Sequence, residues 1–325
     1  MKPPRGVRSG LGLALIMLAV TVVAQGVYPG KSIKLIAPFP PGGGTDIFAR
    51  LLATKLNQTL GWTIVVENKP GAAGSIGLEL AAKSAPDGYT LVMGQTSNLA
   101  INPSLYPKLA YDPLRDFTPV ALVAATPLVL VASPKLTFKS LAEMVAAAKA
   151  KPDAFSIGSP GNGTVGHLTG EMFMRAAGIK LVHVPYKGAS PALTDILAGQ
   201  IDVYFATAQT VAEHVKSGTL RALAVTSSKR LSVLPDVPTI AESGYKDFGA
   251  ISWYGVLVPA GTPESIVGRL NTEINKILQM DAVRASVANE GSDLLGGSRA
   301  EFAAFLESEH AKWSKAVNES GAKVD

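Results

Sequence analysis

The sequence predicts an α/β protein whose two domains face each other across a cleft. Strand-like and helix-like segments alternate from about residue 32 to residue 226, and this alternation is typical of open sheets with helices on both faces. Two long apolar stretches, 119–133 and 251–261, link the parts that alternate, as expected where two extended crossings join two domains. The 325 residues, 47% of them hydrophobic, are enough to build two cores.

The first domain starts with a βαβαβ pattern. Strands are predicted where short apolar runs are bounded by Gly, Pro or Asn, and helices where apolar residues recur every three or four positions. This order predicts a parallel sheet with helices on both faces. The predicted elements are a strand at 32–39, a helix at 47–60 that ends at Gly61, a strand at 62–68, a helix at 75–85 and a strand at 90–94.

The second domain repeats the alternation. Pro127 is expected to split the stretch 119–133 into two strands, one leaving the first domain and one entering the second. With the return crossing at 251–261, we expect 25–126 plus 253–325 to form lobe 1 and 127–252 to form lobe 2. The remaining predicted elements are helices at 141–150, 164–178, 191–199 and 211–218, strands at 155–159, 181–186, 201–207 and 221–226, and C-terminal helical segments at 264–279, 282–291 and 299–321.

The first 24 residues have the pattern of a secretory signal peptide. Lys2, Arg5 and Arg8 precede an apolar run from Leu11 to Ala24 that is too short to span a bilayer; the alternative is a buried N-terminal helix. We therefore expect cleavage near Ala24 and a periplasmic mature protein. Without the leader, the 30 Lys and Arg fall to 27 against 25 Asp and Glu, so the net charge drops from +5 to about +2, which does not indicate a nucleic-acid partner.

The residue types that usually carry catalysis are sparse. The chain has no cysteine, which excludes disulfides, thiolate metal sites and cysteine nucleophiles. The four histidines, His167, His183, His214 and His310, do not match a metal-binding spacing, and no GxSxG motif is present. We expect neither an enzyme nor a bound metal or cofactor, although an enzyme on the same scaffold is the alternative.

Two glycine-rich loops lie where predicted strands lead into helices, "PPGGGTD" at 40–46 and "GSPGNGTVGH" at 158–167. Unpaired N–H groups and the helix dipole at such positions bind anions without a basic side chain. The first loop lacks the lysine of a GxxxxGK[ST] phosphate loop and the GxGxxG spacing, and the charge of Asp46 would repel a polyphosphate. The loops therefore favour a small carboxylate over a nucleotide phosphate.

Each polar residue in these loops, or at the end of a neighbouring strand, can have either a structural role or a ligand-binding role. Asp46 either stabilises its own helix or accepts a hydrogen bond from a ligand ammonium, hydroxyl or bridging water. His167 is either structural or faces the ligand from the start of the second loop's helix. Ser97, Asn98 and Thr207 follow predicted strands and are weaker candidates, because Ser, Asn and Thr commonly form turns.

Several segments together resemble the Bug-type solute receptors, the extracytoplasmic binding proteins of tripartite tricarboxylate transporters. They include "YPGKSIKLIAPFPPGGGTDIFARLLATKL", "VVENKPGAAGSIG", "APDGYTLVMG", "NPSLYPKLAYDPLRDFTPV", "VPYKGASPALTDILAGQIDVYF" and "RALAVTSSKRLSVLPDVPTIAESG". They run in family order over nearly the whole mature chain. One small departure is "GAAG" at 71–74, where a third glycine is frequent.

The resemblance implies a type II periplasmic-binding-protein fold with two α/β lobes and a hinged interdomain cleft. It implies a small ligand, such as a di- or tricarboxylate, an amino acid or an aromatic acid, in a chain expected to be a monomer. The partner would be a tripartite tricarboxylate-type permease or, alternatively, a sensor protein without transport. The ligand-binding residues that it implies are Phe39, Gly43, Gly44, Thr45 and Asp46 in the first loop and Ser159, Gly163, Thr164 and His167 in the second.

Overall fold

The computed structural model describes residues 1–2, 28–320 and 322 of the chain. The predicted signal peptide therefore lies outside the described residues, apart from its first two positions. Within the described part, no helix combines the length and apolar composition that a membrane span requires.

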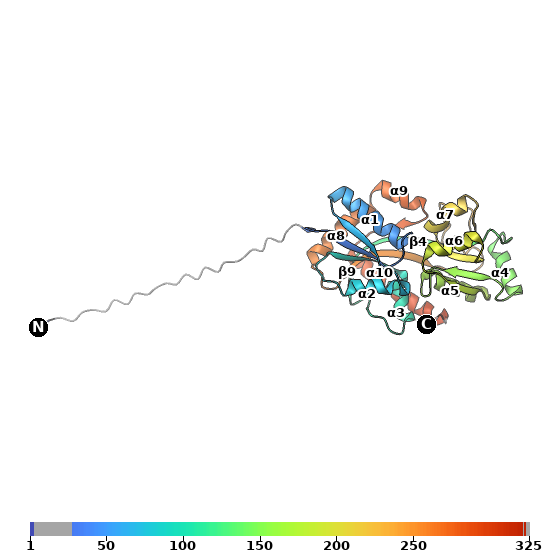
Figure 1. Ribbon diagram of the computed structural model, residues 1–325, viewed down its shortest axis with the longest axis horizontal. Helices are drawn as coiled ribbons and strands as arrows, with labels where there is room; N and C mark the ends of the chain where they lie inside the picture. The colour runs from blue at the N-terminus through green and yellow to red at the C-terminus, as the bar shows by residue number, and fades with distance from the viewer. Residues whose placement is uncertain (3–27, 321, 323–325) are drawn as a thin grey trace.

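Figure 1 shows two lobes side by side, with α1, α2, α8 and α9 on one and α4 to α7 on the other. The first lobe contains β1 (Ile33–Ala37), α1 (Gly44–Leu60), β2 (Ile64–Asn68), the 3-10 turn η1 (Ala72–Gly74), α2 (Ser75–Ala82), β3 (Thr90–Gln95), the π-helical turn η2 (Ser97–Ile101) and α3 (Asn102–Leu105). The second contains α4 (Leu141–Ala150), β5 (Ser156–Ser159), α5 (Val165–Ala177), β6 (Val182–Pro185), α6 (Ala189–Ala198), β7 (Val203–Thr207), α7 (Ala208–Lys216) and β8 (Arg221–Val225). The crossing and returning elements are β4 (Phe117–Ala132), β9 (Ile251–Pro259), α8 (Glu264–Leu278), α9 (Asp281–Asn289), β10 (Asp293–Leu294) and α10 (Arg299–Ser320).

The parallel pairing predicted for the first three strands is confirmed, and the sheets as a whole are mixed. In lobe 1, β2, β1 and β3 are parallel, but β9 is antiparallel to β3 and β4 is antiparallel to β9. In lobe 2, β6, β5 and β7 are parallel, and β4 is antiparallel to β7 and β8. The crossing strands, whose direction the sequence did not predict, are antiparallel because β9 returns from the second lobe and therefore enters the first sheet in the opposite direction.

The strand β4 is continuous, whereas the sequence predicted two strands separated by Pro127. It pairs with β9 as far as Pro127, opposite Ile251, and with β7 from Leu128 onward. Proline lacks an N–H and normally interrupts a ladder. Here it falls where β4 changes partner, so the chain stays extended through it. The proposed boundary between lobe 1 and lobe 2, between residues 126 and 127, falls at this change of partner.

Helix α1 shows how the periodicity of the sequence becomes packing. Phe48, Leu52 and Leu56 are spaced by four residues and are fully buried against the first sheet, as an amphipathic helix requires. Gly61 ends the helix in the left-handed conformation with φ 68°, which glycine adopts without strain. This packing places the N-terminus of α1 at the carboxyl end of β1.

The C-terminal helix α10 contacts elements of both lobes. It packs on β4, η2 and α3 of the first lobe and on α5 of the second. At its centre, the buried carboxylate of Glu309 accepts hydrogen bonds from the indole N–H groups of Trp253 (2.8 Å) and Trp313 (2.9 Å). These bonds satisfy a charge that would otherwise be costly to bury.

Candidate functional site

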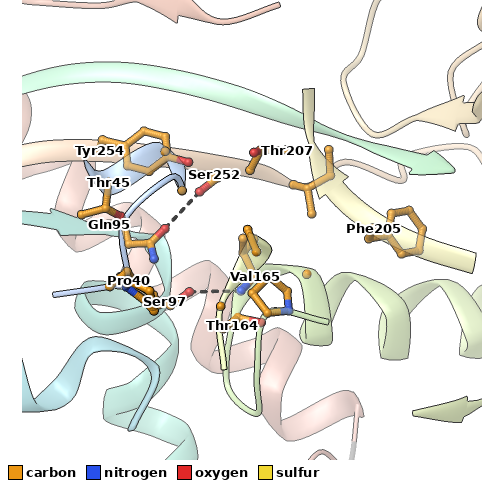
Figure 2. Close-up of a pocket in the computed structure, with 18 of the residues that line it drawn as sticks. Pro40, Thr45, Gln95, Ser97, Thr164, Val165, Phe205, Thr207, Ser252 and Tyr254 are labelled. Atoms are coloured by element: carbon orange, nitrogen blue, oxygen red, sulfur yellow. Dashed lines mark hydrogen bonds between the residues drawn. The ribbon is translucent and has the colours of Figure 1, made fainter. Parts of the chain in front are cut away.

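A cavity between the lobes lies beyond the carboxyl ends of β1, β3, β5 and β7. Its volume is about 60 Å³, room for a few water molecules or one small polar group. This is the position where ligands bind to open α/β sheets. Figure 2 draws most of the residues that line the cavity. The full lining comprises Phe39, Pro40, Gly43, Gly44, Thr45, Gln95, Ser97, Leu128, Pro160, Thr164, Val165, Gly166, Gly188, Ala189, Tyr204, Phe205, Thr207, Ser252 and Tyr254.

The first glycine loop forms the lobe 1 side of the cavity. Gly43 is the N-cap of α1, in an extended conformation with φ −93° and ψ 167°. Because the helix begins at Gly44, the N–H groups of Gly44 and Thr45 have no acceptor within it and remain available to an anion. A Cβ at Gly44 would collide with the hydroxyl of Tyr254 and lie 2.5 Å from Nε2 of Gln209, so only glycine fits there.

The second glycine loop faces the first across the cavity. The hydroxyl of Thr164 caps α5 by accepting from the N–H of His167. The N–H of Val165, in the first turn, donates to Oγ of Ser97 at 3.1 Å, a bond between lobes that is drawn in Figure 2. A serine hydroxyl of lobe 1 thus occupies part of the anion-binding end of α5.

Two donors beside the first loop lack partners within the described part of the chain. The hydroxyl of Tyr204, on a fully buried side chain that lines the cavity, has no hydrogen bond. Nε2 of Gln209 also has none, while its Oε1 accepts from Thr126 and Ser292, each at 3.0 Å. A buried polar group without a partner costs free energy, so a ligand acceptor at the hydroxyl of Tyr204, which lines the cavity, would be favourable.

The pKa values of the two cavity tyrosines keep them as neutral donors. Burial, followed by the neighbouring Tyr254, raises the pKa of Tyr204 far above its ordinary value. Burial likewise raises the pKa of Tyr254 to about 12, against hydrogen bonds with Ser252 and Thr126 that lower it. At neutral pH both hydroxyls therefore carry a proton to donate.

Sequence reasoning missed Tyr204, Gln209 and Tyr254, as well as Gln95 and Ser252, whose side chains hydrogen-bond at 3.2 Å beside the cavity (Figure 2). One signal was available, because Tyr204 places a hydroxyl within the mostly apolar strand β7, VYFAT. Nothing in the local sequence identifies the other four as neighbours of the glycine loop.

Seven of the twelve predicted site residues meet in this lining. In lobe 1 they come from the segment between β1 and the first turn of α1 and from η2; in lobe 2 they come from the loop between β5 and α5 and from the end of β7. These residues are Phe39, Gly43, Gly44, Thr45, Ser97, Thr164 and Thr207.

Asp46 lies behind the loop and outside the lining. Its carboxylate accepts from the N–H of Gly42 (3.1 Å), from Nε of Arg50 (2.9 Å) and from Nδ2 of Asn68 (2.9 Å). Burial raises its pKa, but the bonds from Arg50, Asn68 and Gly42 outweigh burial and hold the pKa below its ordinary value. The geometry therefore favours the helix-stabilising reading, since both carboxylate oxygens are already engaged.

His167 also lies outside the lining. Its Nδ1 accepts from the N–H of Gly163 at 3.2 Å, and its ring stacks on that of His183 with centroids 4.2 Å apart. Burial, and next the neighbouring His183, lower the pKa of His167 to about 4. Nε2 of His183 lies 2.7 Å from the hydroxyl of Ser159. Ser159, Gly163 and His167 thus stabilise the conformation of the second loop and do not line the cavity.

Asn98 is the remaining predicted residue outside the lining. Its Oδ1 accepts from the N–H of Gln95 at 2.9 Å, and its Nδ2 has no partner within the described residues. Among these residues there is also no group of three or more His, Asp and Glu side chains placed to hold a metal ion.

The sequence and the structure of the chain are similar to those of one family of known proteins. The family model described as "Tripartite tricarboxylate transporter family receptor" matches residues 48–322. Protein BugT of Bordetella pertussis is 41% identical over 316 residues, which are 97% of each chain. Among solved structures, R. palustris Rpa4515 with adipate is 34% identical with a TM-score of 0.89, over 91% of this chain and 100% of that one. MatC of Rhodopseudomonas palustris with bound malate is 32% identical with a TM-score of 0.84, over 89% and 100%.

These similarities confirm the predicted fold class and the predicted resemblance. The neighbours are two-lobed periplasmic binding proteins, and the matching family consists of receptors, which agrees with a binding protein rather than an enzyme.

Proposed function

The chain belongs to the tripartite tricarboxylate transporter family of receptors, and from that premise we propose that it captures a small carboxylate in the cavity between its lobes. The observation that carries the proposal is the chemistry of the lining. Hydrogen-bond donors come from the N-terminus of α1 and from the unpartnered Tyr204 hydroxyl, and the described lining contains no charged side chain. Such a site binds an anion through oriented dipoles rather than through a counter-ion.

The same lining argues for an acid without an ammonium group. An ammonium needs a free acceptor, preferably a carboxylate. Asp46, the acid of the first loop, is turned toward Arg50 and Asn68 and away from the cavity. We therefore favour di- and tricarboxylates or aromatic acids over amino acids. The adipate and malate bound to the two solved relatives are acids of the favoured kind.

Two measurements on the mature protein test this proposal. Mass spectrometry of freshly purified protein should detect a bound organic acid, and titration calorimetry should find a carboxylate that binds while nucleotides do not. Saturation at about 100 times Kd adds roughly 2.7 kcal/mol to stability, so a melting-curve screen would reveal the same ligand. Silence of all carboxylates together with a response to nucleotides would overturn the proposal.

We further propose that the mature chain acts in the periplasm as a monomer and delivers its ligand to a membrane permease. The description of the family supports the transport role. Co-purification from membranes would test it: recovery of a permease supports transport, whereas recovery of a sensor protein would favour the signalling alternative. N-terminal sequencing of the exported form should begin near Gln25, and light scattering should give the mass of one chain.

A further inference from the structure

A second, larger cavity lies beside the first, and nothing in the proposed function uses it. Its volume is about 480 Å³. The two cavities share five lining residues, Phe39, Pro40, Pro160, Thr164 and Gly188. The two cavities are therefore neighbours, and a ligand held in the inner cavity could extend past these residues into the outer one.

The walls of the outer cavity differ from those of the inner one. Most of the lining is apolar or backbone, with Phe39, Tyr106 and Tyr186 supplying aromatic surface from both lobes. Lys187 is the one charged residue among the described residues that line either cavity. Its side chain is exposed, and no ion pair of the described residues includes it. The neighbouring carboxylate of Asp195 instead accepts from the hydroxyl of Tyr186 at 2.7 Å.

The lobe 1 wall of this cavity is held in an unusual conformation. Ala72 and Ala73 have φ of 47° and 49°, in the left-handed region that residues other than glycine rarely adopt. Nδ2 of Asn102 holds the segment by donating to the carbonyl of Ala73 (3.2 Å) and to Oγ of Ser75 (2.8 Å). The result is a wall of backbone and methyl groups opposite Lys187, with no acid to compete for the ammonium.

We propose that the outer cavity is a second subsite, which selects elongated dicarboxylates by placing the distal carboxylate at Lys187. This inference rests on the proposed function, because the first carboxylate must occupy the inner cavity. The apolar middle section suits the methylene chain or ring of such a ligand, and it disfavours polyhydroxylated acids. A monocarboxylate of the same length would place its carboxylate in the inner cavity and its chain in the outer one, and it would leave the ammonium of Lys187 unpaired.

Calorimetry with matched ligands tests the subsite. The titrants are a series of straight-chain α,ω-dicarboxylic acids from four to eight carbons and the monocarboxylic acids of equal length. The proteins are the wild type, Lys187→Gln, Lys187→Arg and the control Lys180→Gln. Lys180 is an exposed lysine just before β6, and Lys187 follows the same strand, so the control removes the same charge from the strand's other end.

The expected result is a loss specific to both the ligand and the position. Lys187→Gln should weaken binding of the best diacid about three- to tenfold. This loss lies between the contribution of an exposed ion pair to binding and the larger contribution of a charged hydrogen bond. Lys187→Arg should retain most of the affinity, and the diacid preference of the wild type should shrink as salt is added.

Two results would overturn the inference while leaving the proposed function intact. One is a wild type that binds mono- and dicarboxylates of equal length with equal affinity. The other is a diacid affinity that is unchanged by Lys187→Gln, or lowered equally by Lys180→Gln. If no carboxylate of either kind binds to the wild type, the proposed function itself fails.

Discussion

Gly43→Ala separates ligand contact from folding at the first glycine loop. A Cβ at this position would meet no atom within 4 Å, and the φ of −93° suits any residue. Replacing glycine where the backbone is compatible stabilises by about 0.4–1 kcal/mol, which offsets most of the roughly 0.5–1 kcal/mol lost because alanine is a poorer N-cap than glycine. The free energy of unfolding should therefore change by less than about 1 kcal/mol, a shift of a few degrees in Tm at most.

Binding should respond much more strongly to the same methyl group. Gly43 lines a cavity of about 60 Å³, so the methyl takes space that the ligand needs. Overfilling a tight site costs about 1–3 kcal/mol, which corresponds to an affinity loss of about 5- to 150-fold. Calorimetry with the ligand identified by mass spectrometry, together with melting curves, measures both quantities.

The neighbouring variant Gly44→Ala is the matched control. Its Cβ would collide with Tyr254, so stability and affinity should fall together. Full affinity in Gly43→Ala would refute the reasoning, because the ligand would then not approach the face of the loop that the methyl covers. A large loss of stability in Gly43→Ala would refute it too, since it would mean that the methyl is not in open space.

Three further perturbations test the roles assigned to individual side chains. Asp46→Asn should lower the free energy of unfolding by about 1–3 kcal/mol, the cost of weakening charged hydrogen bonds, and change affinity less than about threefold. Tyr204→Phe should weaken carboxylate binding about tenfold or more with little loss of stability, because the hydroxyl has no partner to lose. His167 has a pKa of about 4 in the folded protein and about 6.5 in the unfolded chain, so between these values the unfolded state binds one proton more than the folded state. The free energy of unfolding should therefore fall by about 3 kcal/mol as the pH drops from 6.5 to 4. Denaturation curves across this range should show the fall, and His167→Gln should reduce it.

Each of these expectations can be contradicted by a distinct result. A large change in affinity in Asp46→Asn with an unchanged melting temperature would show that Asp46 contacts the ligand. Unaltered affinity in Tyr204→Phe would show that its hydroxyl does not meet the ligand. The same fall in stability in His167→Gln as in the wild type between pH 6.5 and 4 would show that His167 is not held neutral, since this comparison cancels the shifted pKa values of His183 and Glu171. The depressed pKa of Asp46 does not confuse this test, since its effect is lost only below about pH 4.

The sequence alone determined which segments become strands and helices and where the glycine loops fall. The spacing of Phe48, Leu52 and Leu56 predicts α1 because a helix repeats every 3.6 residues, and Gly61 marks its end because only glycine adopts the left-handed cap cheaply. The loop before α1 was predicted as an anion site for an equally local reason: a helix N-terminus exposes N–H groups in any context. These features depend on residues a few positions apart, so periodicity and cap chemistry reveal them.

The tertiary structure decided what no local pattern contains. The direction of β9 and the continuity of β4 through Pro127 follow from which strands lie side by side after the chain has crossed between lobes. In the same way, Tyr204 reaches the cavity, and Asp46 turns away from it toward Arg50 and Asn68. Packing between segments far apart in the chain decides which group a side chain contacts. The spacing of residues along the sequence does not show whether that group is another side chain or a ligand.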